Sequence, residues 1–238
     1  LDKETALLNY DPDKYYTVHS KRGNTHGGGS AANLDYYPVD KPNFKENVMP
    51  DPVYALYLNS SSATINNVDE YIKIAEDSKI NAFVVDIKDN QAPGYKSEVM
   101  KNYSPTNYDK ANNSVEGYKN AIKKLKDAGY YVIGRITVFK DKYYALDHPD
   151  NTILDTRTNQ PFLHGGTYWP SPFQRDLWEF NIELAKEAVK EMGFSEIQFD
   201  YVRFPERTGQ YETVGYMNLR NTYNEEKIGA IQRFLMYA

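Results

Sequence analysis

The amino-acid sequence predicts an α/β fold with a parallel sheet, of the (β/α)8 barrel kind. From residue 52 onward, short apolar runs alternate with amphipathic segments of helical period. Charged side chains gather where the runs end, and long polar segments follow the second, third and fourth runs, as on the functional face of such barrels. No glycine-rich phosphate loop follows any run, which disfavours a doubly wound nucleotide-binding sheet.

Four strands are expected, in chain order over 53–58, 82–87, 131–139 and 196–202. The second is apolar almost throughout, as strands buried on both faces of a parallel sheet are. A closed barrel needs eight strands, so the count leaves two alternatives. Either weaker strands occur in the first 50 residues and the long loops, or the chain forms part of a larger barrel, incomplete at its C-terminal side. We favour the second alternative.

Helices are expected between and after these strands, because apolar residues there recur at helical spacing. The third of them ends at Gly193, a residue type that commonly follows a helix. The first three helices are expected around residues 68–75, 118–125 and 177–192. The fourth is expected to begin at about residue 225. Alternating strands and helices of this kind form a parallel sheet with right-handed crossovers.

The sequence divides into an N-terminal extension over 1–50 and the barrel domain over 51–238. The extension is polar and contains the run Gly27-Gly28-Gly29-Ser30, which is typical of a flexible loop. A short piece over 15–18 could pair as a strand.

Composition excludes several functional classes. The 238 residues carry a net charge of −5, which argues against a nucleic-acid-binding surface. No apolar run approaches the ~20 residues that span a bilayer. The chain has no cysteine and four histidines without the H-x-x-x-H spacing, so neither a metal centre nor a cofactor is expected.

The densest group of reactive side chains is Phe199-Asp200-Tyr201-Val202-Arg203-Phe204-Pro205, at the end of the fourth strand. A carboxylate at this place can act as nucleophile or as general acid or base, and Arg203 beside it would keep Asp200 ionised. The alternative is an ion pair that only holds the exit loop in place.

The second strand ends in Asp86, Lys88 and Asp89. Alternation sends Asp86 and Lys88 to one face, where Asp86 would line the pocket and Lys88 would contact substrate. Asp89 would cap or turn the loop. A solvated strand end without function is an equal alternative.

Arg135 lies within the apolar third strand, where an unpaired charge would cost several kcal/mol. It therefore needs a carboxylate neighbour, and Asp86 and Asp200 are the natural candidates. Arg135 would neutralise one of them, tune its pKa or bind a substrate hydroxyl. Lys140 and Asp141, just past this strand, are weaker candidates.

The loop His164-Gly165-Gly166-Thr167-Tyr168-Trp169-Pro170 combines a titratable ring with an aromatic wall. We interpret Tyr168 and Trp169 as a platform for the face of a sugar and His164 as a donor to its hydroxyls. The alternative for Trp169 is a core residue, and Trp178, at helical spacing, is expected in the core.

Four segments resemble one known family: NAFVVDIKD, YYVIGRITVFKD, HGGTYWPSPF and above all EIQFDYVRFP. It is a family of bacterial extracellular proteins, catalogued as a domain of unknown function and predicted to be glycoside hydrolases with a (β/α)8 barrel. The resemblance covers about residues 50–238. It implies a carbohydrate-active role with Asp200 as the catalytic carboxylate, and a further acidic residue on a later strand that this chain lacks.

These observations lead to the hypothesis of a bacterial glycoside hydrolase, secreted or attached to the cell surface, acting on a poly- or oligosaccharide. Such hydrolysis needs two carboxyl groups. Asp200 would be nucleophile or base, with Asp86 as its first partner and Glu206 and Asp141 behind it. Substrate binding is assigned to the remaining candidates: Arg203, Arg135, Lys88, Tyr201, His164, Tyr168 and Trp169. The alternatives are a non-catalytic glycan-binding barrel and a structural surface domain.

Overall fold

The computed structural model describes residues 47–238. The predicted extension, with its strand at 15–18, lies outside this part except for its last few residues. Residues 49–224 form one compact unit, and residues 225–238 belong to a second. Within the described residues, no helix is long and apolar enough to cross a membrane.

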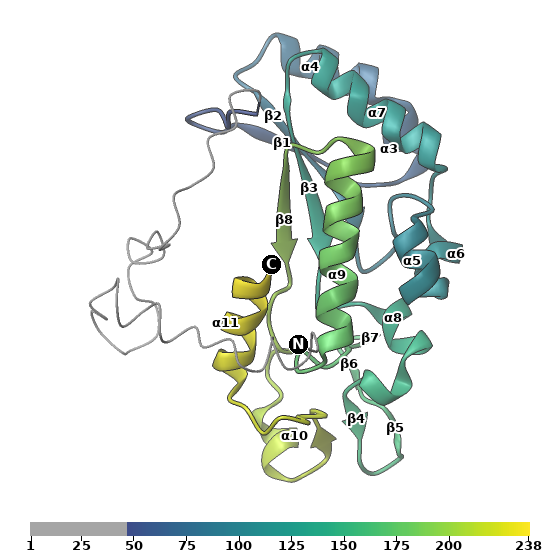
Figure 1. The fold of residues 1–238 in the computed structure, drawn as a ribbon, viewed down its shortest axis with the longest axis vertical. Coiled ribbons are helices and arrows are strands. Elements are labelled where there is room, and N and C mark those ends of the chain that lie inside the picture. The colour runs from purple at the N-terminus through teal and green to yellow at the C-terminus, as the bar shows by residue number, and fades with distance from the viewer. Residues whose placement is uncertain (1–46) are drawn as a thin grey trace, which may run out of the picture. The chain divides into compact units, whose positions relative to one another are not determined.

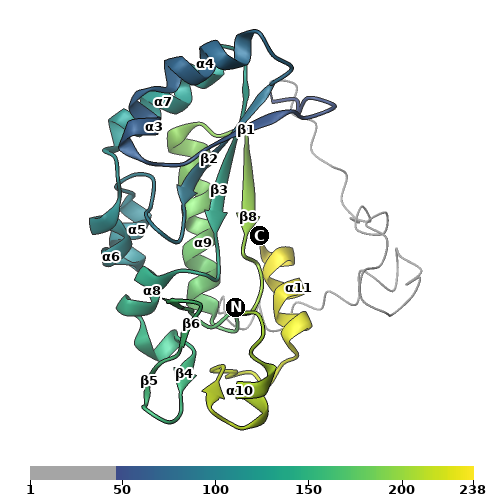
Figure 2. The same cartoon turned by 180° about the vertical axis from the view of Figure 1, so that it is seen from behind.

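A four-stranded parallel sheet forms the centre of the larger unit (Figures 1 and 2). The strands β1 (Ala55–Leu58), β2 (Ala82–Lys88), β3 (Tyr131–Thr137) and β8 (Glu196–Asp200) lie side by side in that order. All three pairings are parallel. The four predicted strands are therefore confirmed, although β1, β3 and β8 are two residues shorter than expected.

The predicted helices are also present, as α4 (Val68–Glu76), α7 (Val115–Asp127) and α9 (Arg175–Glu187) in this unit. A short helix α3 (Ser62–Asn66) precedes α4. Helix α9 continues as a π-helical turn, η3 (Ala188–Met192), and ends at Gly193, whose φ of 88° suits glycine. The last helix, α11 (Lys227–Tyr237), belongs to the second unit.

The order of the strands in the sheet follows the order of the chain. Right-handed crossovers that always advance in one direction place every helix on the same face. Figure 1 shows α4, α7 and α9 on one side of the sheet accordingly. A doubly wound sheet would instead reverse direction and carry helices on both faces. The described residues make this mixed α/β sheet but do not close it into a barrel.

The two faces of the sheet have opposite character. The helix-covered face is apolar, and its side chains Phe83, Val85, Val132 and Ile136 are fully buried. Gly134 also lies on this face, where a Cβ atom would come within 2.3 Å of the Ile87 side chain. Alternation along each strand sends the polar residues to the other face, among them Tyr57, Asp86, Arg135 and Asp200.

The long segments after β2, β3 and β8 contain the remaining elements of the larger unit. Segment 89–114 holds α5 (Glu98–Tyr103) and α6 (Pro105–Lys110). Beyond β3 come α8 (Lys142–Asp147), η2 (Pro149–Asn151), β4 (Leu154–Asp155), β5 (Gln160–Pro161), β6 (Leu163–His164) and β7 (Thr167–Tyr168). Beyond β8 come α10 (Gly209–Thr213) and β9 (Met217–Asn218).

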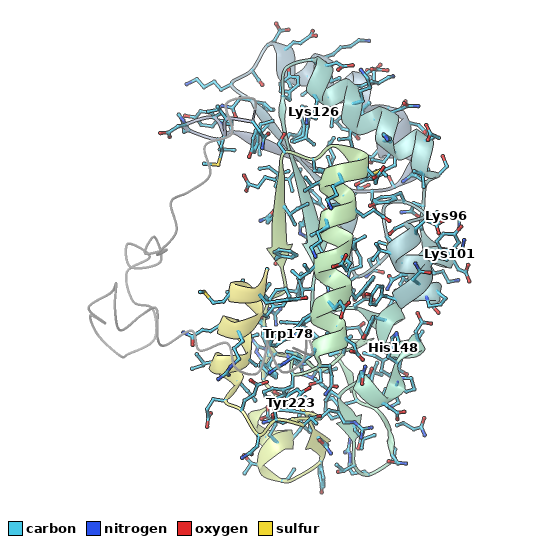
Figure 3. All side chains as sticks on the ribbon, viewed as in Figure 1. Lys96, Lys101, Lys126, His148, Trp178 and Tyr223 are labelled. Atoms are coloured by element: carbon cyan, nitrogen blue, oxygen red, sulfur yellow. The ribbon has the colours of Figure 1, made fainter. Side chains whose placement is uncertain are left out.

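Two of these segments join into a small subdomain. Strand β4 pairs with β5 and with β9, so the segments after β3 and β8 share a three-stranded sheet. In Figure 1 the arrowheads of β3 and β8 point toward it. Its apolar cluster comprises Ile153, Phe162, Trp169 and Met217. Trp178, at the beginning of α9 (Figure 3), is fully buried, which confirms the expectation of a core residue.

Candidate active site

Arg135 on β3 links carboxylates from the two neighbouring strands. Its Nη1 lies 2.7 Å from Asp86 Oδ1, and its Nε and Nη2 lie 2.9 and 2.8 Å from Asp200 Oδ2. Nη1 also lies 3.4 Å from Asp89 Oδ1. The prediction that this arginine needs Asp86 or Asp200 as its neighbour is confirmed, and it uses both. The sheet register explains this. Asp86 on β2 is paired with Arg135, and Asp200 on β8 is paired with Thr137, two residues further along β3 on the same face as Arg135.

Asp86 is enclosed by its partners, with a side chain only 2% exposed. The hydroxyl of Tyr57, on β1, donates to Asp86 Oδ2. The hydroxyl of Tyr118, on α7, donates to the Asp86 carbonyl oxygen at 2.7 Å. Both carboxylate oxygens of Asp86 are therefore engaged, one by Tyr57 and one by Arg135.

The electrostatics of this group follow from burial and pairing. Burial raises the pKa of Asp86 above its ordinary value of 3.8, although the hydrogen bonds from Tyr57 and Arg135 oppose this. For Arg135, burial disfavours the charged form, but the bonds and charges of Asp86 and Asp200 outweigh it and raise its pKa. Burial and the bond to Asp86 raise the pKa of Tyr57. Arg135 thus stays charged and Tyr57 stays a neutral donor.

A bulge at the end of β2 changes the expected order of its side chains. The register with β3 shifts between Asp86 and Lys88, so Lys88 pairs with Ile136. Strict alternation fails here. Asp89 returns to Arg135 and also accepts a hydrogen bond from the Gln91 amide at 3.1 Å, a turn-forming contact.

Lys88 is buried away from solvent, so its predicted contact with substrate is wrong. Its side chain is 1% exposed and its Nζ lies 2.6 Å from Asp141 Oδ2 and 2.5 Å from the Thr137 carbonyl oxygen. Asp141 also accepts from Asn107 and from the amides of Tyr143 and Tyr144 at the start of α8. This network attaches the loop after β3 to the sheet and to α6, and Asp141 is not available to a substrate.

Asp200 is the most accessible carboxylate around Arg135, with 41% of its side chain exposed against 28% for Asp89. It is the last residue of β8, as predicted. Its second oxygen, Oδ1, accepts from the Tyr201 amide at 2.6 Å. Tyr201 has a φ of 53°, a left-handed conformation that non-glycine residues seldom adopt. The carboxylate is therefore held in one orientation while remaining open to solvent.

The arginine that holds Asp200 is Arg135, and the prediction that Arg203 does so is wrong. Arg203 Nη2 lies 3.1 Å from Glu206 Oε1, and the two side chains are 40% and 66% exposed. Arg203 and Lys140 both approach the rings of Tyr201 and Trp169. The chain turns at Tyr201, directly after β8, and Arg203 makes no ion pair with Asp200.

The predicted aromatic platform is only partly available. His164 and Tyr168 lie on the hairpin β6–β7 and are half-buried. Trp169 is 4% exposed because it packs in the cluster with Ile153, Phe162 and Met217. Its interpretation as an exposed platform is wrong, and the alternative of a core residue is correct. The neighbours of Trp169 in the sequence suggested an exposed loop. The small core that buries it forms when β4 pairs with β9, which local sequence does not indicate.

Sequence reasoning missed Tyr57. Tyr57 is 52% exposed, and its hydroxyl donates a hydrogen bond to the nearly buried carboxylate of Asp86. The available signal was alternation: Tyr57 pairs with Val84, and Asp86 lies two residues further on the same face. The apolar surroundings of Tyr57 gave no hint of a polar role.

The carboxylates of this site do not form a metal-binding group. Among residues 47–238, no three acidic or histidine side chains are arranged to hold an ion. The guanidinium of Arg135 occupies the place between Asp86 and Asp200 and supplies the positive charge there.

The fold of this chain is similar to that of several solved structures. Structures of glycosidases share the fold: a chitobiase from Flavobacterium johnsoniae (TM-score 0.52, 16% identity) and an exo β-N-acetylglucosaminidase from Vibrio harveyi (TM-score 0.52, 10% identity). The matches cover 77% and 76% of this chain but 28% and 34% of those chains. The chain thus spans about a third of their length.

A hypothetical protein from Ruminiclostridium thermocellum is more similar, with 30% identity and a TM-score of 0.62 over 76% of this chain and 90% of that one. Residues 55–238 match the model of the family described as a putative glycosyl hydrolase domain. The chain belongs to this family. No curated protein matches its sequence.

Proposed function

We propose that this chain carries a glycoside hydrolase site at the carboxyl ends of β3 and β8, with Asp200 as nucleophile or base. The observation that carries the proposal is the state of Asp200: oriented by Arg135 and the Tyr201 amide, yet 41% exposed. Membership of a family described as a putative glycosyl hydrolase domain supports the reaction class. The substrate class is a poly- or oligosaccharide and the location extracellular or cell-surface-attached.

We propose Glu206 as the second carboxyl group. Of the three partners predicted for Asp200, Asp86 and Asp141 are buried and occupied, whereas the Glu206 side chain is 66% exposed. Arg203 at 3.1 Å can orient it. Asp86 acts in this scheme as a positioning residue, because it fixes Arg135 and through it Asp200.

The finer fold we propose is a (β/α)8 barrel, of which these four strands form one sector. The support is the unreversed strand order with the crossover helices α4, α7 and α9 on one face, an arrangement that further strands of the same kind would extend into a closed ring. The polar face with Tyr57, Asp86 and Arg135 would then point inward.

The test is a hydrolysis screen of the chain against bacterial and plant polysaccharides with Asp200→Asn and Glu206→Gln. Asp200→Asn should lower activity by about 10²–10⁴-fold with the fold intact, and exposed Asp109→Asn on α6 should match the wild type. Loss of an acid catalyst is masked by a good leaving group, so Glu206→Gln should retain activity on dinitrophenyl glycosides and lose it on polysaccharides. Undiminished hydrolysis by Asp200→Asn would refute the assignment.

One observation favours the glycan-binding alternative: two of the three predicted partner carboxylates are occupied by structural contacts. Binding of a glycan without hydrolysis by the wild type or Asp200→Asn would support that alternative.

A further inference from the structure

Two cationic side chains flank the same pair of aromatic rings beside Asp200. Lys140 Nζ lies 4.9 Å from the centre of the Tyr201 ring and 5.9 Å from that of Trp169. Arg203 Cζ lies 5.0 and 5.4 Å from the same two centres. The Tyr201 ring that both cations approach belongs to the residue that directly follows Asp200, the proposed catalytic carboxylate.

The two cations are not equally neutralised. Arg203 pairs with Glu206 at 3.1 Å. Lys140 has no carboxylate partner among the described residues, and the carboxylate of the adjacent Asp141 is directed to Lys88. A half-exposed lysine with no carboxylate partner among residues 47–238 thus lies beside the Tyr201 ring, in a chain whose net charge is −5.

Two positive charges that both lie within 6 Å of the same two ring centres repel each other, and the faces of the rings offset only part of this repulsion. An anionic group on a bound ligand would offset the repulsion that remains between Lys140 and Arg203. Arginine presents a planar fork that matches a carboxylate with two hydrogen bonds, and lysine adds a mobile point charge.

We propose that Lys140 and Arg203 form an acidic-sugar subsite, which binds the carboxylate of a uronic acid or of a similar carboxylated sugar next to Asp200. The inference rests on the proposed function for the position of the sugar, and it makes the substrate a charged glycan. Lys140 is then a specificity-determining residue, fixed over Tyr201 by the loop that Lys88 and Asp141 attach to the sheet.

The experiment measures binding of the full chain to polygalacturonate, alginate and hyaluronate, each beside its carboxyl-reduced or methyl-esterified form. At least one acidic polymer should bind ten or more times more tightly than its uncharged form. Lys140→Gln should weaken that binding by about 10–100-fold, the contribution of one charge-assisted hydrogen bond.

The matched control is Lys142→Gln, which removes a nearby lysine that also lies over a tyrosine ring, Tyr143 at 4.8 Å. It should bind as the wild type does. Equal affinity for charged and uncharged forms, no binding to any acidic polymer, or an unaffected Lys140→Gln would overturn the inference. Dextran sulfate bound as tightly as the uronates would overturn the carboxylate assignment in favour of a general polyanion surface.

Binding and hydrolysis separate this inference from the proposed function. Charge-dependent binding without hydrolysis of any polymer would refute the hydrolase and support the acidic-sugar subsite. Hydrolysis restricted to neutral glycans, abolished in Asp200→Asn, would support the hydrolase and refute the acidic-sugar subsite.

Discussion

Arg135 directs two of its nitrogens, Nε and Nη2, at the same carboxylate oxygen of Asp200, at 2.9 and 2.8 Å. The third nitrogen, Nη1, reaches Asp86 at 2.7 Å. One guanidinium thus couples a buried carboxylate on β2 to an accessible one at the end of β8. The orientation of Asp200 thus depends on Arg135 and, through it, on the buried Asp86.

Arg135→Met should lower the free energy of unfolding by about 3–5 kcal/mol, because it leaves the buried Asp86 carboxylate without its charge partner. Urea denaturation at neutral pH measures this. Protonation can relieve the unpaired Asp86, so the loss should shrink at acid pH. Lys73→Met removes a pair with Glu70 in which both side chains are exposed, and it should have a smaller effect. Equal losses at both sites would contradict the argument.

Tyr57→Phe should destabilise the fold by about 1 kcal/mol, since it deletes a hydrogen bond to a buried carboxylate. It should also raise the pKa of Asp86 further, because that bond favours the charged form. Thermal unfolding and carboxyl-carbon NMR titration are the measurements. Tyr54→Phe, at a similarly exposed tyrosine just before β1, is the control and should change neither quantity.

The raised pKa of Asp86 predicts a pH dependence with a definite sign. Between its ordinary value of 3.8 and the raised value, the folded state binds more protons than the unfolded state. Asp86 therefore makes stability fall as pH rises through that window, and no further change follows above it. Asp86→Asn should remove this contribution, seen as a difference in the slope of unfolding free energy against pH. The exposed Asp109→Asn should keep the wild-type slope.

Gly134→Ala should cost about 1–3 kcal/mol, because the added methyl overlaps the Ile87 side chain at 2.3 Å and Phe194 at 3.0 Å. Gly209→Ala at the start of α10 meets no atom within 4 Å and serves as the control. Chemical denaturation of both variants measures the loss of stability and so tests how tightly side chains pack on the helix-covered face of the sheet. A Gly134→Ala variant as stable as Gly209→Ala would show that this face is loosely packed.

Local pattern in the sequence determined the larger elements. Apolar runs and helical spacing predicted all four parallel strands and the helices between them, because burial against a common sheet imposes those periods. The position of Asp200 at a strand end made it the candidate carboxylate. The cost of an unpaired charge in an apolar strand predicted the partners of Arg135.

Only the tertiary structure decided how these side chains are used. A bulge after Asp86 sent Lys88 into a buried pair with Asp141, and pairing of β4 with β9 buried Trp169. The register of β1 and β2 places the Tyr57 hydroxyl where it donates a hydrogen bond to Asp86. Each of these outcomes depends on contacts between segments far apart in the chain, and the period of a single segment does not determine which partner it will meet.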